Sequence, residues 1–213
     1  MGHEVFSPTL TGVGERCHLL TRNIDLTTHI SDIVNVLRFE DLSEVILVGH
    51  SYGGMVVTGA ADLARDRIAR LVYLDAFVPK HGQSVMDLQP PERVVYYHKV
   101  AAEKGDGWKV PPQPASFWKL TDLKDLELTD RLSVDHPLAT LEQKLELSDG
   151  MGYPGPRAFI WASGFNPSPF VKFAEAYRHD PSWMYREIDS GHMMMISHPE
   201  QTTALLADIS QSH

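Results

Sequence analysis

The chain has 213 residues, of which 43% are hydrophobic and 22% charged, a composition ordinary for a soluble globular protein. Its formal charge of −9 would repel a phosphate backbone and an anionic lipid surface, so we expect no nucleic acid and no membrane among its partners. The single cysteine, Cys17, cannot form an internal disulfide, and the first residues do not resemble a signal peptide, so a cytoplasmic protein is expected.

The first 80 residues alternate apolar runs with amphipathic segments. Strands are expected at residues 5–7, 44–48 and 70–74, and helices at residues 25–41 and 55–65. The second and third strands are continuous apolar runs, which are typical of strands buried on both faces. A strand, a helix and a strand of these lengths predict a right-handed parallel crossover.

The rest of the chain divides into a helical insertion and a return of the strand pattern. The insertion covers about residues 80–154 and has helix-like pieces at residues 92–103, 121–130 and 138–147. Strands then follow at residues 157–161 and 183–188, and helices at residues 170–177 and 199–209. The order predicts one α/β domain over residues 1–213, with a mostly parallel sheet flanked by helices and a helical cap.

A G-x-S-x-G motif lies between the second strand and the helix that follows it. Gly49, Ser51 and Gly53 supply its fixed positions, and the strand-to-helix context is that of a nucleophile elbow. In such a turn the two glycines let strand and helix approach, and Gly54 adds further room. The turn would place Ser51 at the positive end of the helix, with the Tyr52 backbone N–H directed at an oxyanion.

The predicted general base is His192, on the loop directly after the last strand. A serine nucleophile needs a proton acceptor, and a histidine that follows the serine in the chain and comes last matches the hydrolase order. The other histidines are scattered singly, without the spacing that would direct two imidazoles to one metal, so we expect no metal site.

Four segments together resemble a known superfamily. They are residues 49–54 (GHSYGG), 189–199 (DSGHMMMISHP), 9–16 (TLTGVGER) and 71–79 (LVYLDAFVP). They are similar to the α/β hydrolases that include plant methyl esterases, hydroxynitrile lyases and bacterial esterase-like members. The resemblance extends over nearly the whole chain and is weakest in the insertion. It implies an α/β-hydrolase fold and a Ser-His-acid triad acting on esters.

The acid of the triad departs from the family pattern. Methyl esterases have an aspartate after the strand that corresponds to residues 157–161, whereas the loop at residues 162–167 contains no carboxylate here. Some haloalkane dehalogenases resemble this chain in placing their acid one strand earlier, where Asp75 stands. We therefore predict Asp75, which would accept a hydrogen bond from His192 Nδ1–H. The alternatives that stay open are Asn166 as a neutral group, and Asp189 or Asp180.

The resemblance also bears on the start of the chain. Hydrolases of this fold take a second oxyanion donor from a loop, usually rich in His and Gly, after an early strand. Neither that strand nor that loop is found before residues 44–48. The sequence is therefore expected to be an N-terminally truncated form or to have its natural start upstream of Met1, and to be less stable than an extended chain.

The predicted substrate pocket contains His50, Phe77, Trp118 and Met193, and the expected ligand is a small-molecule ester. Aromatic residues of the insertion form either an apolar lid or the insertion's own core: Tyr96, Tyr97, Trp108, Phe117 and Trp118. The methionines that follow His192 are expected to fill irregular space at the pocket floor. The oligomeric state stays open, a homodimer included.

Other functions of the same fold compete with ester hydrolysis. A hydroxynitrile lyase is disfavoured because those lyases have a lysine directly after the histidine, where this chain has Met193. Dehalogenases and epoxide hydrolases need a carboxylate nucleophile in place of Ser51. A non-catalytic ligand binder or an inactive fragment stays open. No cofactor is expected, since Gly12 and Gly14 lack the third glycine of a dinucleotide site.

Overall fold

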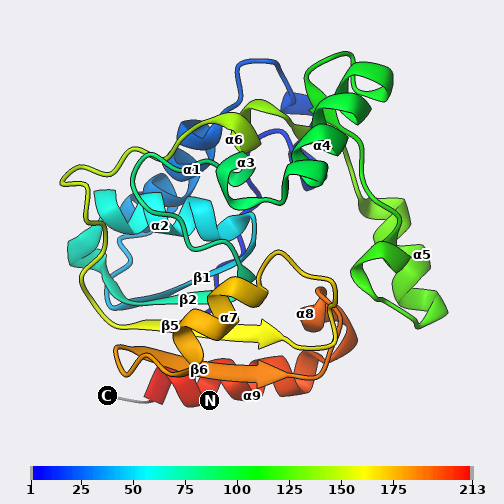
Figure 1. The fold of residues 1–213 in the computed structure, drawn as a ribbon. Helices are drawn as coiled ribbons and strands as arrows, with labels where there is room; N and C mark the ends of the chain where they lie inside the picture. Colours follow the sequence, from blue (N-terminus) through cyan, green and yellow to red (C-terminus); the bar gives the residue numbers. More distant parts are fainter. Residues whose placement is uncertain (1, 212–213) are drawn as a thin grey trace.

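A four-stranded parallel sheet forms the centre of the protein (Figure 1). This is a computed structural model, and it describes residues 2–211. The strands are β1 (Val45–Ser51), β2 (Ile68–Ala76), β5 (Arg157–Ala162) and β6 (Trp183–Ile188), in the spatial order β1-β2-β5-β6. All three pairings are parallel, which confirms the predicted α/β architecture.

Helices cover both faces of this sheet. They are α1 (Leu26–Phe39), α2 (Gly53–Leu63), α7 (Val171–Arg178) and α9 (Pro199–Gln211). The contacts of Tyr73 in β2 show that α2 and α7 cover the same face. Its hydroxyl is hydrogen-bonded to Thr58 of α2. Its ring lies 5.6 Å from that of Trp183, which stacks on Tyr177 of α7. On the opposite face, Arg70 of β2 donates a hydrogen bond to the Ile209 carbonyl of α9.

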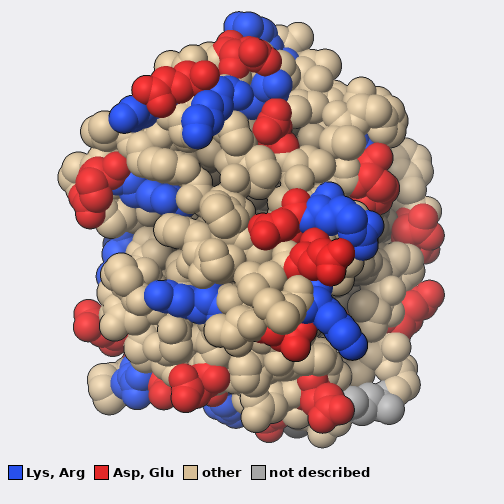
Figure 2. Space-filling view, turned by 90° about the vertical axis from the view of Figure 1, so that its right-hand side faces the viewer, with Lys and Arg blue, Asp and Glu red and all other residues tan. Residues whose placement is uncertain are grey.

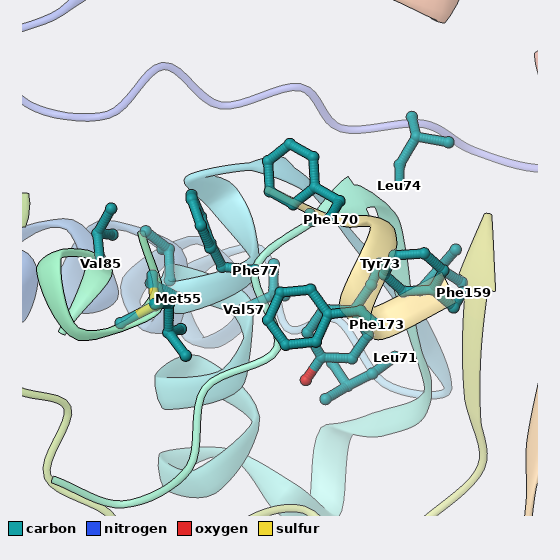
Figure 3. Packing of buried hydrophobic residues seen from close by; sticks show 14 of the residues in the cluster. Met55, Val57, Leu71, Tyr73, Leu74, Phe77, Val85, Phe159, Phe170 and Phe173 are labelled. Atoms are coloured by element: carbon teal, nitrogen blue, oxygen red, sulfur yellow. The ribbon is translucent and has the colours of Figure 1, made fainter. Parts of the chain in front are cut away.

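A large part of the hydrophobic core lies between the sheet and the helices α2 and α7. Figure 3 shows Leu71, Tyr73 and Phe159 of the sheet gathered with Phe173 of α7. Phe159 is fully buried and Tyr73 is 2% exposed. Truncating a buried aromatic residue of this kind to alanine typically costs about 3–5 kcal/mol. The sheet edge that carries the site is therefore built on rigid strands.

The predicted insertion at about residues 80–154, called the cap below, contains short helices and one small strand pair. They are α3 (Val85–Leu88), α4 (Pro91–Lys104), β3 (Lys109–Val110), the 3-10 turn η3 (Ala115–Trp118), α5 (Leu123–Leu132), β4 (His136–Pro137) and α6 (Ala139–Glu142). Figure 1 shows α3, α4 and α6 above α2, with α5 projecting away from the body. The antiparallel pair of β3 and β4 was not predicted, because two-residue strands leave no periodic pattern in a sequence.

Three predicted elements differ from the structure. The strand at residues 5–7 is wrong: Val5 is 82% exposed, and Pro8 cannot donate to a ladder that would continue it. β1 is not buried on both faces, because it lies at the sheet edge, and Val48 is 37% exposed. The helix at residues 138–147 ends at Glu142, since Gln143 exchanges two hydrogen bonds with Thr27.

The surface carries both signs of charge. On the face shown in Figure 2, Lys and Arg alternate with Asp and Glu and do not form a patch of one sign. Among residues 2–211, none of the helices combines the length and the apolar character needed to span a bilayer. The same residues bring together no group of three or more His, Cys, Asp and Glu side chains that could hold a metal ion.

Candidate active site

Ser51 stands in the strained turn that joins β1 to α2. Its φ of 55° lies in the left-handed region, which a non-glycine residue adopts only when the surrounding structure enforces it. The Ser51 carbonyl accepts a hydrogen bond from the Phe77 N–H at 3.1 Å, so the turn is tied to the strand β2 beside it. Tyr52 follows as the N-cap residue of α2, which places its N–H at the positive end of that helix.

Two glycines make the turn sterically feasible, but they are not the pair that the motif suggested. A Cβ at Gly49 would lie 2.6 Å from the Gly53 carbonyl oxygen, and a Cβ at Gly54 only 2.0 Å from the Phe77 carbonyl oxygen. A Cβ at Gly53 would meet nothing within 4 Å. Gly49 and Gly54 therefore allow the close approach of strand and helix, whereas Gly53 is not needed for it.

Asp75 and His192 form a buried hydrogen-bonded pair. His192 Nδ1 lies 2.6 Å from Asp75 Oδ2, and the two side chains are 2% and 0% exposed. The Ala162 N–H lies 3.4 Å from Asp75 Oδ1. An ionised carboxylate can only accept, so when Asp75 is ionised the Nδ1 atom carries the hydrogen and Nε2 has the lone pair that a general base requires.

The Ser51 turn and the Asp75–His192 pair lie at the same carboxyl edge of the sheet. Ser51 pairs with Ala76, the neighbour of Asp75, and Asp75 binds His192. No hydrogen bond between Ser51 Oγ and His192 is present within residues 2–211. In serine hydrolases this bond is often long before substrate binds and shortens in the complex.

Aromatic rings enclose the His192 imidazole. Phe170 stacks on it at 5.2 Å with an interplanar angle of 12°, Phe165 at 4.8 Å and 26°, and Trp118 lies 5.1 Å away. Burial lowers the pKa of His192 to about 3, so the imidazole is neutral at pH 7. Burial raises the pKa of Asp75 to about 7, above that of an ordinary carboxylate.

Two neighbours hold the loop that carries His192. His50 Nε2–H donates to the His192 carbonyl at 2.9 Å, with the two rings 4.3 Å apart, and burial lowers the pKa of His50 to about 3. The His192 N–H donates to the Trp118 carbonyl of the cap at 3.0 Å. A Cβ at Gly191 would lie 2.6 Å from that same carbonyl oxygen, so the cap rests directly on the loop.

The four predicted pocket residues do not all reach His192. The rings of His50 and Trp118 contact it, whereas Phe77 packs against Phe170 at 4.8 Å and reaches the imidazole only through that ring. Met193 is half-buried at the N-cap of α8 (Met194–Ser197), and the fully buried methionine is Met194.

The aromatic residues of the cap do not all have the same role: some face the site and others pack in the core. Trp118 faces His192, and Phe117 packs edge-on against Trp118 at 4.7 Å. Tyr96 and Tyr97 of α4 pack against the main hydrophobic core. Trp108 lies apart from both groups and contacts the Arg22 and Lys109 cations.

The alternative partners for His192 lie away from its imidazole. Asn166 and Asp189 are exposed, and Asp180 accepts two hydrogen bonds from Ser182 in its own turn. Sequence reasoning missed the stacking rings of Phe165 and Phe170. Their signal was two phenylalanines close together in the loop region after β5, at the sheet edge where the triad was expected.

Comparison with known proteins agrees with this architecture. The chain matches the Alpha/beta hydrolase family over residues 1–205. It is 42% identical over 214 residues to a carbendazim hydrolyzing esterase of Nocardioides sp. (strain SG-4G), covering 97% of this chain and 88% of that protein. It is 29% identical over 242 residues to methylesterase 3 of Arabidopsis thaliana, covering 97% and 89%.

A solved structure has the same fold. It is an extracellular alpha/beta-hydrolase from a Paenibacillus species, described as sharing structural and functional homology with tobacco salicylic acid binding protein 2. The TM-score is 0.87 at 23% identity, with 99% of this chain and 89% of that chain covered. The predicted fold and ester chemistry are thus confirmed at the level of the family, and the chain belongs to the alpha/beta hydrolase family as a carboxylic ester hydrolase.

Proposed function

We propose that this esterase cleaves small carboxylic esters through an acyl-enzyme formed on Ser51. The observation that carries the proposal is the buried hydrogen bond of 2.6 Å between Asp75 and His192, at the sheet edge where the Ser51 turn ends. It keeps His192 Nε2 unprotonated and gives the imidazolium an ionised partner when one forms.

The reaction begins when Ser51 Oγ attacks the ester carbonyl and its proton moves to His192 Nε2. The oxyanion that forms accepts a hydrogen bond from the Tyr52 N–H at the start of α2. When the intermediate collapses, the alkoxide leaves with the proton from His192, and the acyl group stays on Ser51. Water then attacks the acyl group, gives its proton to His192, and Ser51 leaves with that proton as the acid is released.

The aromatic enclosure supports a small ester as the substrate. Phe165, Phe170 and Trp118 pack around the imidazole and form an apolar wall beside the reacting atoms. Relatives that bear the names methylesterase and carbendazim hydrolyzing esterase make methyl esters and carbendazim the first compounds to test. His192 is followed by Met193, an uncharged residue, and this favours hydrolysis over hydroxynitrile cleavage.

Labelling with a serine-directed phosphonate tests the proposal, because only an activated serine reacts quickly. We expect the protein to gain one phosphonyl group by intact mass, at Ser51 in the peptide map, and Ser51→Ala to gain none. Ser133 is a suitable matched control, because its hydroxyl bonds the Thr129 carbonyl in the cap, and Ser133→Ala should label like the wild type. An unlabelled wild type would favour a ligand-binding protein.

A further inference from the structure

The residue beside the proposed nucleophile has a side chain held by a buried histidine. The Tyr52 hydroxyl lies 2.9 Å from Nδ1 of His29 in α1. His29 is fully buried, and its other ring nitrogen, Nε2, lies 2.9 Å from the Thr11 carbonyl oxygen. The mechanism above uses neither of these side chains, although the Tyr52 backbone supplies its oxyanion donor.

The tautomer of His29 follows from its partners. A carbonyl oxygen can only accept, so Nε2 carries the hydrogen and Nδ1 is left with a lone pair. The Tyr52 hydroxyl must therefore donate to Nδ1. Burial lowers the pKa of His29, which keeps this arrangement neutral, and burial raises the pKa of the Tyr52 phenol. Both side chains are thus locked in one orientation.

The far end of this chain of hydrogen bonds is itself anchored. The Thr11 N–H donates to Asp32 Oδ2 at 2.6 Å, and the Thr11 hydroxyl donates to Asp32 Oδ1 at 2.9 Å. Asp32 belongs to α1, the helix that also carries His29. The Tyr52 side chain is therefore fixed to a rigid helix through His29, and not to a loop that could follow its movements.

The cap packs against the same tyrosine through His136, whose ring also lies 6.1 Å from the His29 ring. His136 of β4 meets the Tyr52 ring edge-on, with the ring centroids 4.9 Å apart and the planes at 77°. The Thr140 hydroxyl donates to the Pro137 carbonyl and accepts from His136 Nε2–H, which orients His136. Tyr52, directly after Ser51, is thus held by both α1 and the cap.

We propose that His29 and the Tyr52 hydroxyl are positioning residues for the esterase reaction, which keep the Tyr52 N–H directed at the oxyanion. The proposal rests on the proposed function, because it assigns the support of the oxyanion donor in that mechanism. An oxyanion donor that is even slightly displaced loses much of its stabilising effect, since this effect depends on short distances to the developing charge. The contact should therefore affect turnover more than substrate binding.

Tyr52→Phe tests this directly, because it removes one hydroxyl and keeps the ring and the backbone N–H. We expect kcat for a nitrophenyl ester to fall about tenfold with KM within about twofold, and phosphonate labelling to slow by a similar factor. The matched control is Tyr153→Phe, which removes a hydroxyl that donates to the Ile68 carbonyl at 3.0 Å, at the opposite end of β2. Tyr153→Phe should keep the wild-type kcat even if its Tm falls as much as that of Tyr52→Phe.

Variants of His29 provide the second arm. His29→Gln keeps one amide N–H for Thr11 and one amide oxygen for Tyr52, so it should retain more of the kcat than His29→Leu, which keeps neither. Adding Tyr52→Phe to His29→Leu should cost less than the product of the two single losses, because both changes break the Tyr52–His29 contact, and only Tyr52→Phe also removes the hydroxyl's interaction with Thr140. Losses that multiply in the double variant would contradict a shared role.

The outcomes separate this proposal from the one on which it rests. A wild-type protein that hydrolyses no ester and is not labelled would overturn the proposed function, and the positioning role with it. An active wild type whose kcat is unchanged by Tyr52→Phe would overturn the positioning role alone. So would an equal fall in kcat for Tyr52→Phe and Tyr153→Phe, since that would reflect a loss of stability only.

Discussion

The Asp75 side chain is fully buried and bonded to His192, so we expect any contribution of Asp75 to catalysis to act through His192. Replacing Asp75 by asparagine keeps the shape but offers an amide that can bind either imidazole tautomer. We expect Asp75→Asn to lower kcat by about three to four orders of magnitude, as loss of the orienting acid does in serine hydrolases generally. Steady-state hydrolysis of a nitrophenyl ester would measure it, and Asp189→Asn, at an exposed position, is the control. Near-normal turnover of Asp75→Asn would contradict its assignment.

The pH dependence of activity should follow from the same burial. Burial raises the pKa of Asp75 to about 7, so the carboxyl is increasingly protonated below that pH and cannot stabilise an imidazolium. We expect kcat/KM to rise with pH through about 7 and to level off above it. Rates measured between pH 5 and 9 would check this, with Asp75→Asn lacking the rise. A wild-type profile that is flat over that range would contradict the prediction.

The residues of the candidate site could not all be predicted equally well from the sequence. Ser51 was predictable because its turn is formed by neighbours in the chain. The contact of Asp75 with His192 joins residues 117 positions apart, so it depends on the strand order of the sheet, and only the resemblance to known hydrolases suggested it. The sequence places Phe165 and Phe170 near this sheet edge, but no local pattern indicates which ring will stack on the imidazole.

Two adjacent glycines at the junction of β1 and α2 have different steric surroundings. At Gly54 a methyl group would collide with the Phe77 carbonyl oxygen, which belongs to the backbone and cannot move aside cheaply, whereas at Gly53 it would enter open space. We expect Gly54→Ala to destabilise the protein by about 1–3 kcal/mol or more and to abolish activity. Gly53→Ala should keep its stability, because alanine is the better helix former. Thermal unfolding of the two variants would measure this, and equal melting temperatures would contradict it.

Elements with a strong periodic pattern were predicted well. The helix expected from residue 25 is α1, where Asp25 accepts from the Thr28 N–H in a capping box. The helix expected at residues 138–147 failed after Glu142 because Gln143 is drawn to Thr27, a contact between segments 116 positions apart. Such tertiary competition is not visible in a local window.

The architecture of the whole molecule depends on the spatial order of the strands in the sheet. The sequence predicted this order only in part. The parallel crossovers could be predicted from the alternation of strands and helices. The place of each strand could not, since β1 has as apolar a sequence as β2 yet lies at the edge, with Val48 partly exposed (Figure 1). The cap extends from one side of this sheet to the His192 loop, which it contacts through Trp118.

The proposed function requires Ser51 to be the nucleophile of an active esterase site. Hydrolysis of a short-chain nitrophenyl ester by the wild type and by Ser51→Ala, at equal concentration and above pH 7, tests it most directly. We predict turnover by the wild type and a fall to near the uncatalysed rate for Ser51→Ala, with both proteins folded by circular dichroism. Equal rates for the two proteins, or no turnover by either, would contradict the proposed function.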